Sequence, residues 1–177
     1  FKEHPHYHMY LHPEMPSYEE QMNSRNRMLD QHPSLTFIGA HMASLEWSVE
    51  ALSSFLEDNP KAVVDMAARI GQIQHQSMEN YAKVRDFFIK YQDRILYATD
   101  LTLSKGQTGA EFLQEAMDVW QSDWDYLATD NMLTSSFVEG EFRGLQLPKK
   151  VINKIYRTNA ERVFKKNFFN KTLIEQH

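Results

Sequence analysis

Three short apolar runs occur along the chain, and each run ends in a polar side chain. The runs, with the polar residues that follow them, are 35–40 with His41, 62–68 with Arg69, and 94–99 with Asp100. Runs of this length, bounded by turn residues, predict buried β-strands. A strand that meets water ends in a polar residue for that reason alone. Three such endings in series, separated by helical segments, favour a shared functional edge.

The segments between the runs show helical spacing and helix stop signals. Ser17 followed by Glu20 forms a capping-box pattern, which predicts a helix to about Gln31. Further helices are expected from Ser44 or Glu46 to 57, over 78–91, over about 110–120, and from Pro148 to about 164. Segment 71–77 is expected to be a connection, and 121–147 an irregular aromatic and acidic stretch.

The order of these elements predicts an α/β fold. The expected strands begin about 27 and 32 residues apart, which is typical of βα units in a parallel sheet with right-handed crossovers. Because a closed eight-stranded barrel needs about 250 residues, three strands cannot close one. The alternatives are a small open α/β layer and the C-terminal part of a barrel.

Composition excludes several classes of protein. The 177 residues carry a formal net charge of −5 without a basic stripe, which argues against a nucleic-acid binder. No apolar stretch approaches the roughly 18 residues that a membrane span needs. The chain has no cysteine, which fits a reducing compartment, so a cytoplasmic location is expected. The chain begins at Phe1 within a polar segment, and we expect an upstream part to precede it.

Four strings of residues together resemble the amidohydrolase superfamily, specifically its amidohydrolase-2 group of metal-dependent TIM-barrel enzymes. They are 37–41, 64–69, 88–100 and 147–164. The resemblance spans about 17–165 and implies that the three strands are barrel strands six, seven and eight. On this interpretation 1–177 is a single incomplete barrel domain. It comprises a loop over 1–16, βα units over 17–165 and a tail over 166–177.

The resemblance also implies roles for two residues. His41 matches a metal ligand or substrate-polarising group, and Asp100 matches a residue that ligates the metal or accepts a proton from its bound water. The implied cofactor is a divalent metal, with zinc expected. The family's further ligands include a His-x-His pair, and His4, His6 and His8 have that spacing. Pro5 and the lack of a preceding apolar run favour a loop there instead, so the chain by itself should lack a complete metal site.

Other residues have both a functional and a structural interpretation. Arg69 is expected either to clamp a substrate carboxylate or to form an ion pair with Asp65 or Glu79. Glu46 and Trp47 are candidate substrate-binding residues, although Glu46 also suits a helix N-terminus.

Two further interpretations concern Asp65 and the aromatic residues of the irregular stretch. For Asp65 we favour a buried hydrogen-bonding role. The aromatic residues are expected to form either a substrate lid or a cover over a helix surface. They are Trp120, Trp124, Tyr126 and Phe137.

The function favoured by the resemblance is metal-dependent hydrolysis of a small organic substrate by a metal-activated water. The alternatives are a decarboxylase or hydratase on the same scaffold and a non-catalytic α/β binding module. The strand at 35–40 should form an unpaired sheet edge. We therefore expect it to be covered by a missing N-terminal part, a second chain or another copy in a homo-oligomer, with neither nucleic acid nor membrane as a partner.

Overall fold

The computed structural model describes residues 11–168. The chain forms two compact units, Phe1–Thr36 and Phe37–His177. In the first unit, α1 (Tyr18–Gln31) begins after Ser17, whose side chain accepts a hydrogen bond from the Glu20 amide while the Glu20 carboxylate accepts one from the Ser17 amide. The predicted capping box is confirmed. The histidines at positions 4, 6 and 8 and most of the tail lie outside the described residues.

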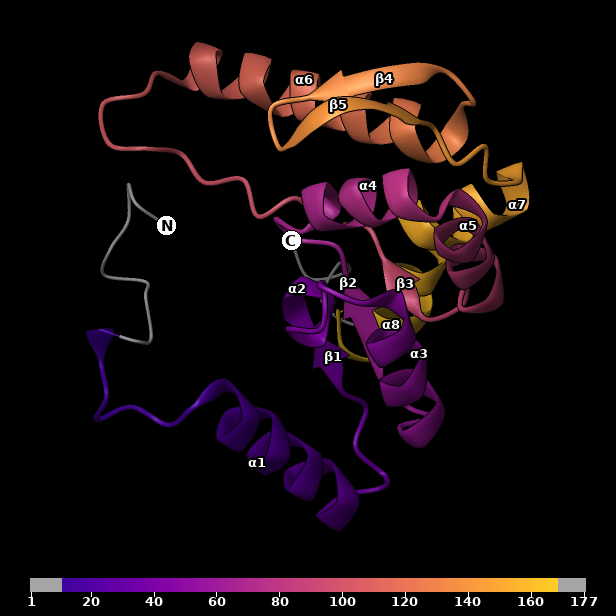
Figure 1. Cartoon of the computed structure of the whole chain (residues 1–177). Helices are drawn as coiled ribbons and strands as arrows, with labels where there is room; N and C mark the ends of the chain where they lie inside the picture. The colour runs from indigo at the N-terminus through magenta and orange to yellow at the C-terminus, as the bar shows by residue number, and fades with distance from the viewer. Residues whose placement is uncertain (1–10, 169–177) are drawn as a thin grey trace, which may run out of the picture. The chain divides into compact units, whose positions relative to one another are not determined.

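The second unit is built on a three-stranded parallel sheet (Figure 1). Its strands β1 (Ile38–Gly39), β2 (Val63–Asp65) and β3 (Ile95–Leu96) lie in the order β1-β2-β3, with all neighbours parallel. The prediction of a parallel sheet is confirmed, although the strands are shorter than the apolar runs. The sheet is not a closed barrel. Within residues 11–168, β1 has a single strand neighbour, as expected for an edge strand.

Three helices of ten residues each follow the first two strands. They are α3 (Val49–Asp58), α4 (Ile70–Glu79) and α5 (Tyr81–Lys90). The N-cap of α3 is Ser48, whose side chain accepts from the Ala51 amide, so the expected start at Ser44 or Glu46 is wrong. The expected connection over 71–77 is also wrong, because α4 occupies it. That helix buries Ile73 together with the polar Gln74. Because part of its buried face is polar, the sequence shows no apolar periodicity there.

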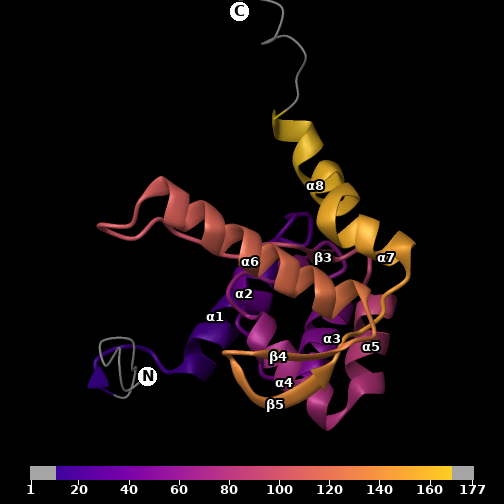
Figure 2. The ribbon, with the colours of Figure 1, turned by 90° about the horizontal axis from the view of Figure 1, so that it is seen from above.

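The stretch expected to be irregular is regular instead. Helix α6 (Gly109–Ala128) continues well beyond Trp120 and is followed by the antiparallel hairpin β4 (Met132–Ser135) and β5 (Val138–Arg143). The hairpin packs against α4 and also against α6, where the Phe142 ring meets the Tyr126 ring edge-on. Figure 2 shows α6 beside the hairpin from above. Together these elements form a layer over the C-terminal side of the sheet.

The last helical segment bends through a π-helical turn. It runs as α7 (Lys149–Asn153), η3 (Lys154–Thr158) and α8 (Asn159–Phe168), beginning directly after Pro148 as predicted. The buried Asn159 side chain donates hydrogen bonds to the carbonyls of Gln92 and Ile95 and so ties the segment to β3. Within the described part of the chain, no helix is long and apolar enough to cross a membrane.

Candidate active site at the sheet edge

A left-handed turn follows β1 and carries His41. In α2 (Ala40–Ala43) and the residue after it, the φ angles of His41, Met42, Ala43 and Ser44 lie between 54° and 57°. The amide of Ser44 donates to the carbonyl of His41 at 3.0 Å, which closes the turn. The left-handed conformation costs a residue other than glycine roughly 1–2 kcal/mol. His41 is therefore held in a backbone that the surrounding structure must stabilise.

Residues with a left-handed backbone cluster at one edge of the sheet. Among the described residues other than glycine, positive φ angles occur after β1, at Ala68 after β2 and at Asp100 after β3, with Gln146 as the single position elsewhere. The strands are parallel, so these residues share the C-terminal edge. Gly39 helps to form this edge, since a Cβ atom there would lie 2.6 Å from that of Ala43. Backbone strain of this type clusters at functional sites.

Asp65 joins the ends of β1 and β2. Its Oδ1 atom accepts hydrogen bonds from the amide of His41 at 2.9 Å and from the amide of Ala67 at 3.1 Å. A carboxylate that accepts backbone N–H groups stabilises the loop that presents them. The predicted hydrogen-bonding role of Asp65 is confirmed, but the residue is half-buried and not buried, and it holds the turn that contains His41.

The imidazole of His41 is fixed in one tautomer. Its Nδ1 atom lies 2.8 Å from the carbonyl oxygen of Ala67. A carbonyl oxygen only accepts, so Nδ1 must carry the proton, and the neutral ring then has its lone pair on Nε2. A backbone carbonyl in this position is a common second partner of metal-binding histidines. His41 is thus prepared to bind an electrophile through Nε2.

Glu46 and Arg69 form an ion pair across the same edge. The Nε atom of Arg69 donates to Oε1 of Glu46 at 3.0 Å, and its Nη1 donates to the carbonyl of Ala68 at 3.0 Å. Arg69 therefore pairs with Glu46 and with neither Asp65 nor Glu79. The second carboxylate oxygen of Glu46 is buried without a hydrogen-bond partner. The substrate-binding roles of Glu46 and Arg69 stay predictions.

Asp100 lies exposed in the connection after β3, between two residues that line a cavity. Its position at the C-terminal side of β3 puts it on the same sheet edge as His41, in line with the topology that the sequence predicted. Within residues 11–168, no group of three or more histidine, aspartate or glutamate side chains could together hold a metal ion. These residues by themselves do not fit a complete catalytic zinc centre, which usually needs three protein ligands.

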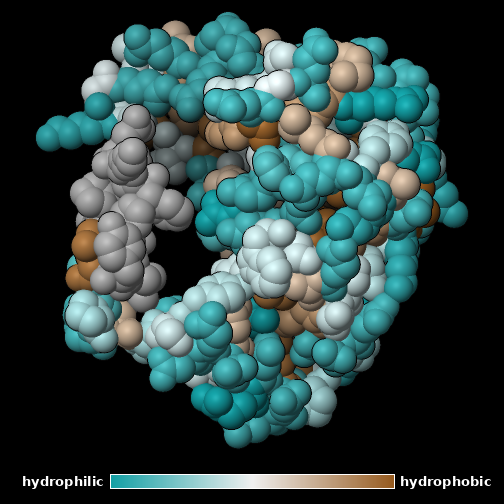
Figure 3. Space-filling view, in the orientation of Figure 1, coloured by the Kyte–Doolittle hydropathy of each residue, from teal (hydrophilic) through white to brown (hydrophobic). Residues whose placement is uncertain are grey.

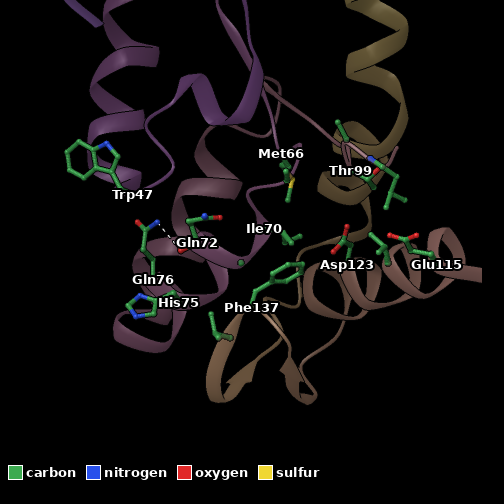
Figure 4. Close-up of a pocket in the computed structure, with 16 residues that line it drawn as sticks. Trp47, Met66, Ile70, Gln72, His75, Gln76, Thr99, Glu115, Asp123 and Phe137 are labelled. Atoms are coloured by element: carbon green, nitrogen blue, oxygen red, sulfur yellow. Dashed lines mark hydrogen bonds between the residues drawn. The ribbon is translucent and has the colours of Figure 1, made fainter. Parts of the chain in front are cut away.

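A cavity of about 600 Å³ lies next to this edge. Its walls come from the ends of β2 and β3, from α4 and α6, and from the hairpin, and apolar surface is visible beneath the hairpin in Figure 3. Trp47 and Phe137 both line it, and Phe137 points inward from the hairpin (Figure 4). Of the aromatic residues considered as a lid, Phe137 alone contributes to this cavity. Tyr126 is buried and Trp124 meets the Tyr156 ring.

Sequence reasoning missed a buried polar cluster behind one wall of the cavity. The hydroxyl of Tyr97 donates to Oδ2 of Asp123 at 2.8 Å, and the Tyr97 ring stacks on Tyr156 with centroids 4.2 Å apart. Burial raises the pKa of Asp123 to about 6. The Tyr156 hydroxyl is buried without a hydrogen-bond partner. A signal was present: Glu115, Val119 and Asp123 recur at helical spacing, which puts them on one face of α6.

Comparison with known families identifies the class of protein. A family model described as amidohydrolase matches residues 8–166. The chain belongs to the amidohydrolase family, and this membership indicates a hydrolase-type activity. The resemblance read from the residues is confirmed. No curated protein and no solved structure matches the chain.

Proposed function

We propose that this chain is the C-terminal part of a metal-dependent, barrel-type hydrolase that acts on a small organic substrate. In this proposal His41 is a metal ligand and Asp100 is a metal ligand or the base that takes up a proton. The metal is divalent, with zinc expected. Trp47, Glu46 and Arg69 contact the substrate. Family membership and the parallel order of the three strands support this proposal.

The observation that carries the proposal is the state of the His41 ring. Two hydrogen bonds, from its amide to Asp65 and from its Nδ1 to the Ala67 carbonyl, fix the residue and direct the lone pair to Nε2. A histidine with a purely structural role could be held equally well by a loop with ordinary, negative φ angles. The strain of the four consecutive left-handed residues would then destabilise the fold without any functional benefit.

The remaining metal ligands belong, in this proposal, to residues outside those described. The described residues offer His41 and Asp100 but no third ligand beside them. The full-length protein, or a second copy of the chain, would supply the rest. A non-catalytic module is the competing proposal, and the missing third ligand is the observation in its favour.

The test compares His41→Gln with His75→Gln in the full-length protein. His75 is an exposed residue of α4 and serves as the matched control. Zinc content after dialysis and hydrolysis of p-nitrophenyl acetate would be measured for both. We expect His41→Gln to lower the zinc content and to reduce turnover at least ~100-fold, with His75→Gln unchanged. Equal zinc content and equal turnover in the two variants would favour the non-catalytic module.

A further inference from the structure

The cavity beneath the hairpin has two carboxyl groups in its walls, and His75 is the one basic side chain among its lining residues. Asp123 and Glu115 line it, and none of the lining residues is lysine or arginine. Both carboxyl groups come from α6, two turns apart, and Figure 4 shows them on the same side of that helix. The rest of the wall is mainly apolar. Such a wall disfavours anions and suits a cation that carries an apolar body.

Both carboxyl groups accept hydrogen bonds from neutral donors only. Asp123 is 5% exposed and accepts from the Tyr97 hydroxyl, and Glu115 accepts from the side-chain amide of Gln107 at 2.6 Å. Within the part of the chain that the structure describes, neither carboxylate takes part in an ion pair. A buried carboxylate without a counter-charge is costly, and burial accordingly raises the pKa of Asp123.

A second observation concerns the polar cluster behind this wall, although Tyr156 itself does not line the cavity. The Tyr156 hydroxyl is buried and has no hydrogen-bond partner, although a buried hydroxyl normally has one. Tyr156 lies on the π-helical turn η3 and stacks on the tyrosine that donates to Asp123. Turns of this kind often occur at functional sites. The cluster therefore holds more polar groups than its internal hydrogen bonds satisfy.

We propose that this cavity binds a small organic ammonium ion, with its charged nitrogen at Asp123 and its apolar body against Ile70, Val119 and Phe137. The cation supplies the counter-charge that Asp123 lacks. A volume of about 600 Å³ is ample for an arylalkylamine. The site goes beyond the proposed hydrolase function, because neither His41 nor Asp100 lines the cavity and no metal is required, although Trp47 belongs to both sites.

Three probes that share a phenyl ring test the proposal on the full chain. They are 2-phenylethylamine, 2-phenylethanol and phenylacetate, which carry a positive, a neutral and a negative group, and their dissociation constants would be measured by titration calorimetry. We expect the amine to bind at least tenfold tighter than the alcohol, and the acid weakest. Asp123→Asn should weaken the amine at least tenfold and leave the alcohol within twofold. The matched control is Asp118→Asn, an exposed position on the same helix, which should change neither.

Two further variants keep the test decisive. Phe137→Ala removes an apolar wall residue that is 70% exposed, so the fold should tolerate it and all three probes should weaken together. His41→Gln should leave amine binding unchanged, which separates this site from the hydrolase proposal. The proposal is overturned if none of the probes binds, or if the amine binds no tighter than the alcohol. It is also overturned if Asp118→Asn weakens the amine as much as Asp123→Asn does.

Discussion

Two carboxylates of the second unit, Asp65 and Asp123, show how partners decide the role of an acid. Asp65 accepts two backbone N–H groups and fixes the turn at His41. Asp123 accepts one phenol hydroxyl and faces a cavity. The first is satisfied by the fold and stabilises it. The second has no positively charged partner among the described residues, so it is the carboxylate with which a cationic ligand would pair.

The backbone that positions the side chains also differs between the two regions. The edge at His41 places its side chains by strained, left-handed residues. The wall at Asp123 places its side chains by the regular spacing of α6, a helix of 20 residues with a capping box at Thr108 and Glu111. A strained edge is specific to one geometry and sensitive to each supporting contact. A helical wall tolerates change, because each lining position is set independently by the helix.

The largest effect is expected from Asp100→Asn at the sheet edge. An amide cannot take up a proton at neutral pH, and general acid–base groups contribute roughly 10²–10⁴-fold to rates. We expect turnover of p-nitrophenyl acetate by the full-length protein to fall at least ~100-fold. The melting temperature should change little, because Asp100 is exposed. Turnover near the wild-type value would remove Asp100 from the chemistry.

The next effect is expected from Asp65→Ala. The substitution leaves the amides of His41 and Ala67 without their acceptor, and each unsatisfied donor costs about 1–3 kcal/mol. Urea unfolding should show a loss of about 2–4 kcal/mol. Asp86→Ala, at an exposed position of α5, is the control and should change stability by less than about 0.5 kcal/mol. Similar losses in both variants would mean that Asp65 does not hold the edge.

A smaller, pH-dependent effect is expected from Asp123→Asn. Burial raises the pKa of Asp123 from 3.8 to about 6, so the folded chain takes up a proton between these values. The stability due to protonated Asp123 is therefore present below pH 3.8 and is lost as the pH rises through 6. We expect the variant to gain about 1–2 kcal/mol on the wild type between about pH 4.5 and about pH 7.5.

Urea unfolding at those two pH values measures this gain. The other titratable groups near Asp123 are Tyr97 directly after β3, Tyr156 on η3 and Glu115 on α6, and all three remain in the variant. Their contributions cancel in the difference between the two proteins. A difference that stays the same at both pH values would show that Asp123 is not shifted by burial.

Local patterns made part of this structure predictable. The capping box at Ser17 and Glu20 depends on residues three positions apart, and the helix start at Pro148 depends on one residue. The parallel sheet followed from the spacing of three apolar runs. The hairpin was missed because its turn residues, around Phe137, carry none of the glycine pairs that mark tight hairpins.

The candidate site was predictable in its residues but not in its geometry. His41 and Asp100 could be named because each follows a strand. The hydrogen bonds that fix the His41 amide and ring reach residues 24 and 26 positions away, and no local pattern encodes them. The left-handed turn was equally hidden, because alanine and methionine do not signal that conformation. The Glu46 partner of Arg69 was missed for the same reason, at a separation of 23 residues.

The most direct test of the account is the tautomer of His41 and its response to zinc. Long-range proton–nitrogen correlation spectra of the full-length protein separate the two ring nitrogens of each histidine, and His75→Gln and His41→Gln would assign the signals. We predict a protonated Nδ1 and a bare Nε2 for His41 without zinc, and a shift of the His41 Nε2 signal when zinc is added, with His75 unaffected. A protonated Nε2, or a spectrum that zinc leaves unchanged, would contradict the proposed role of His41.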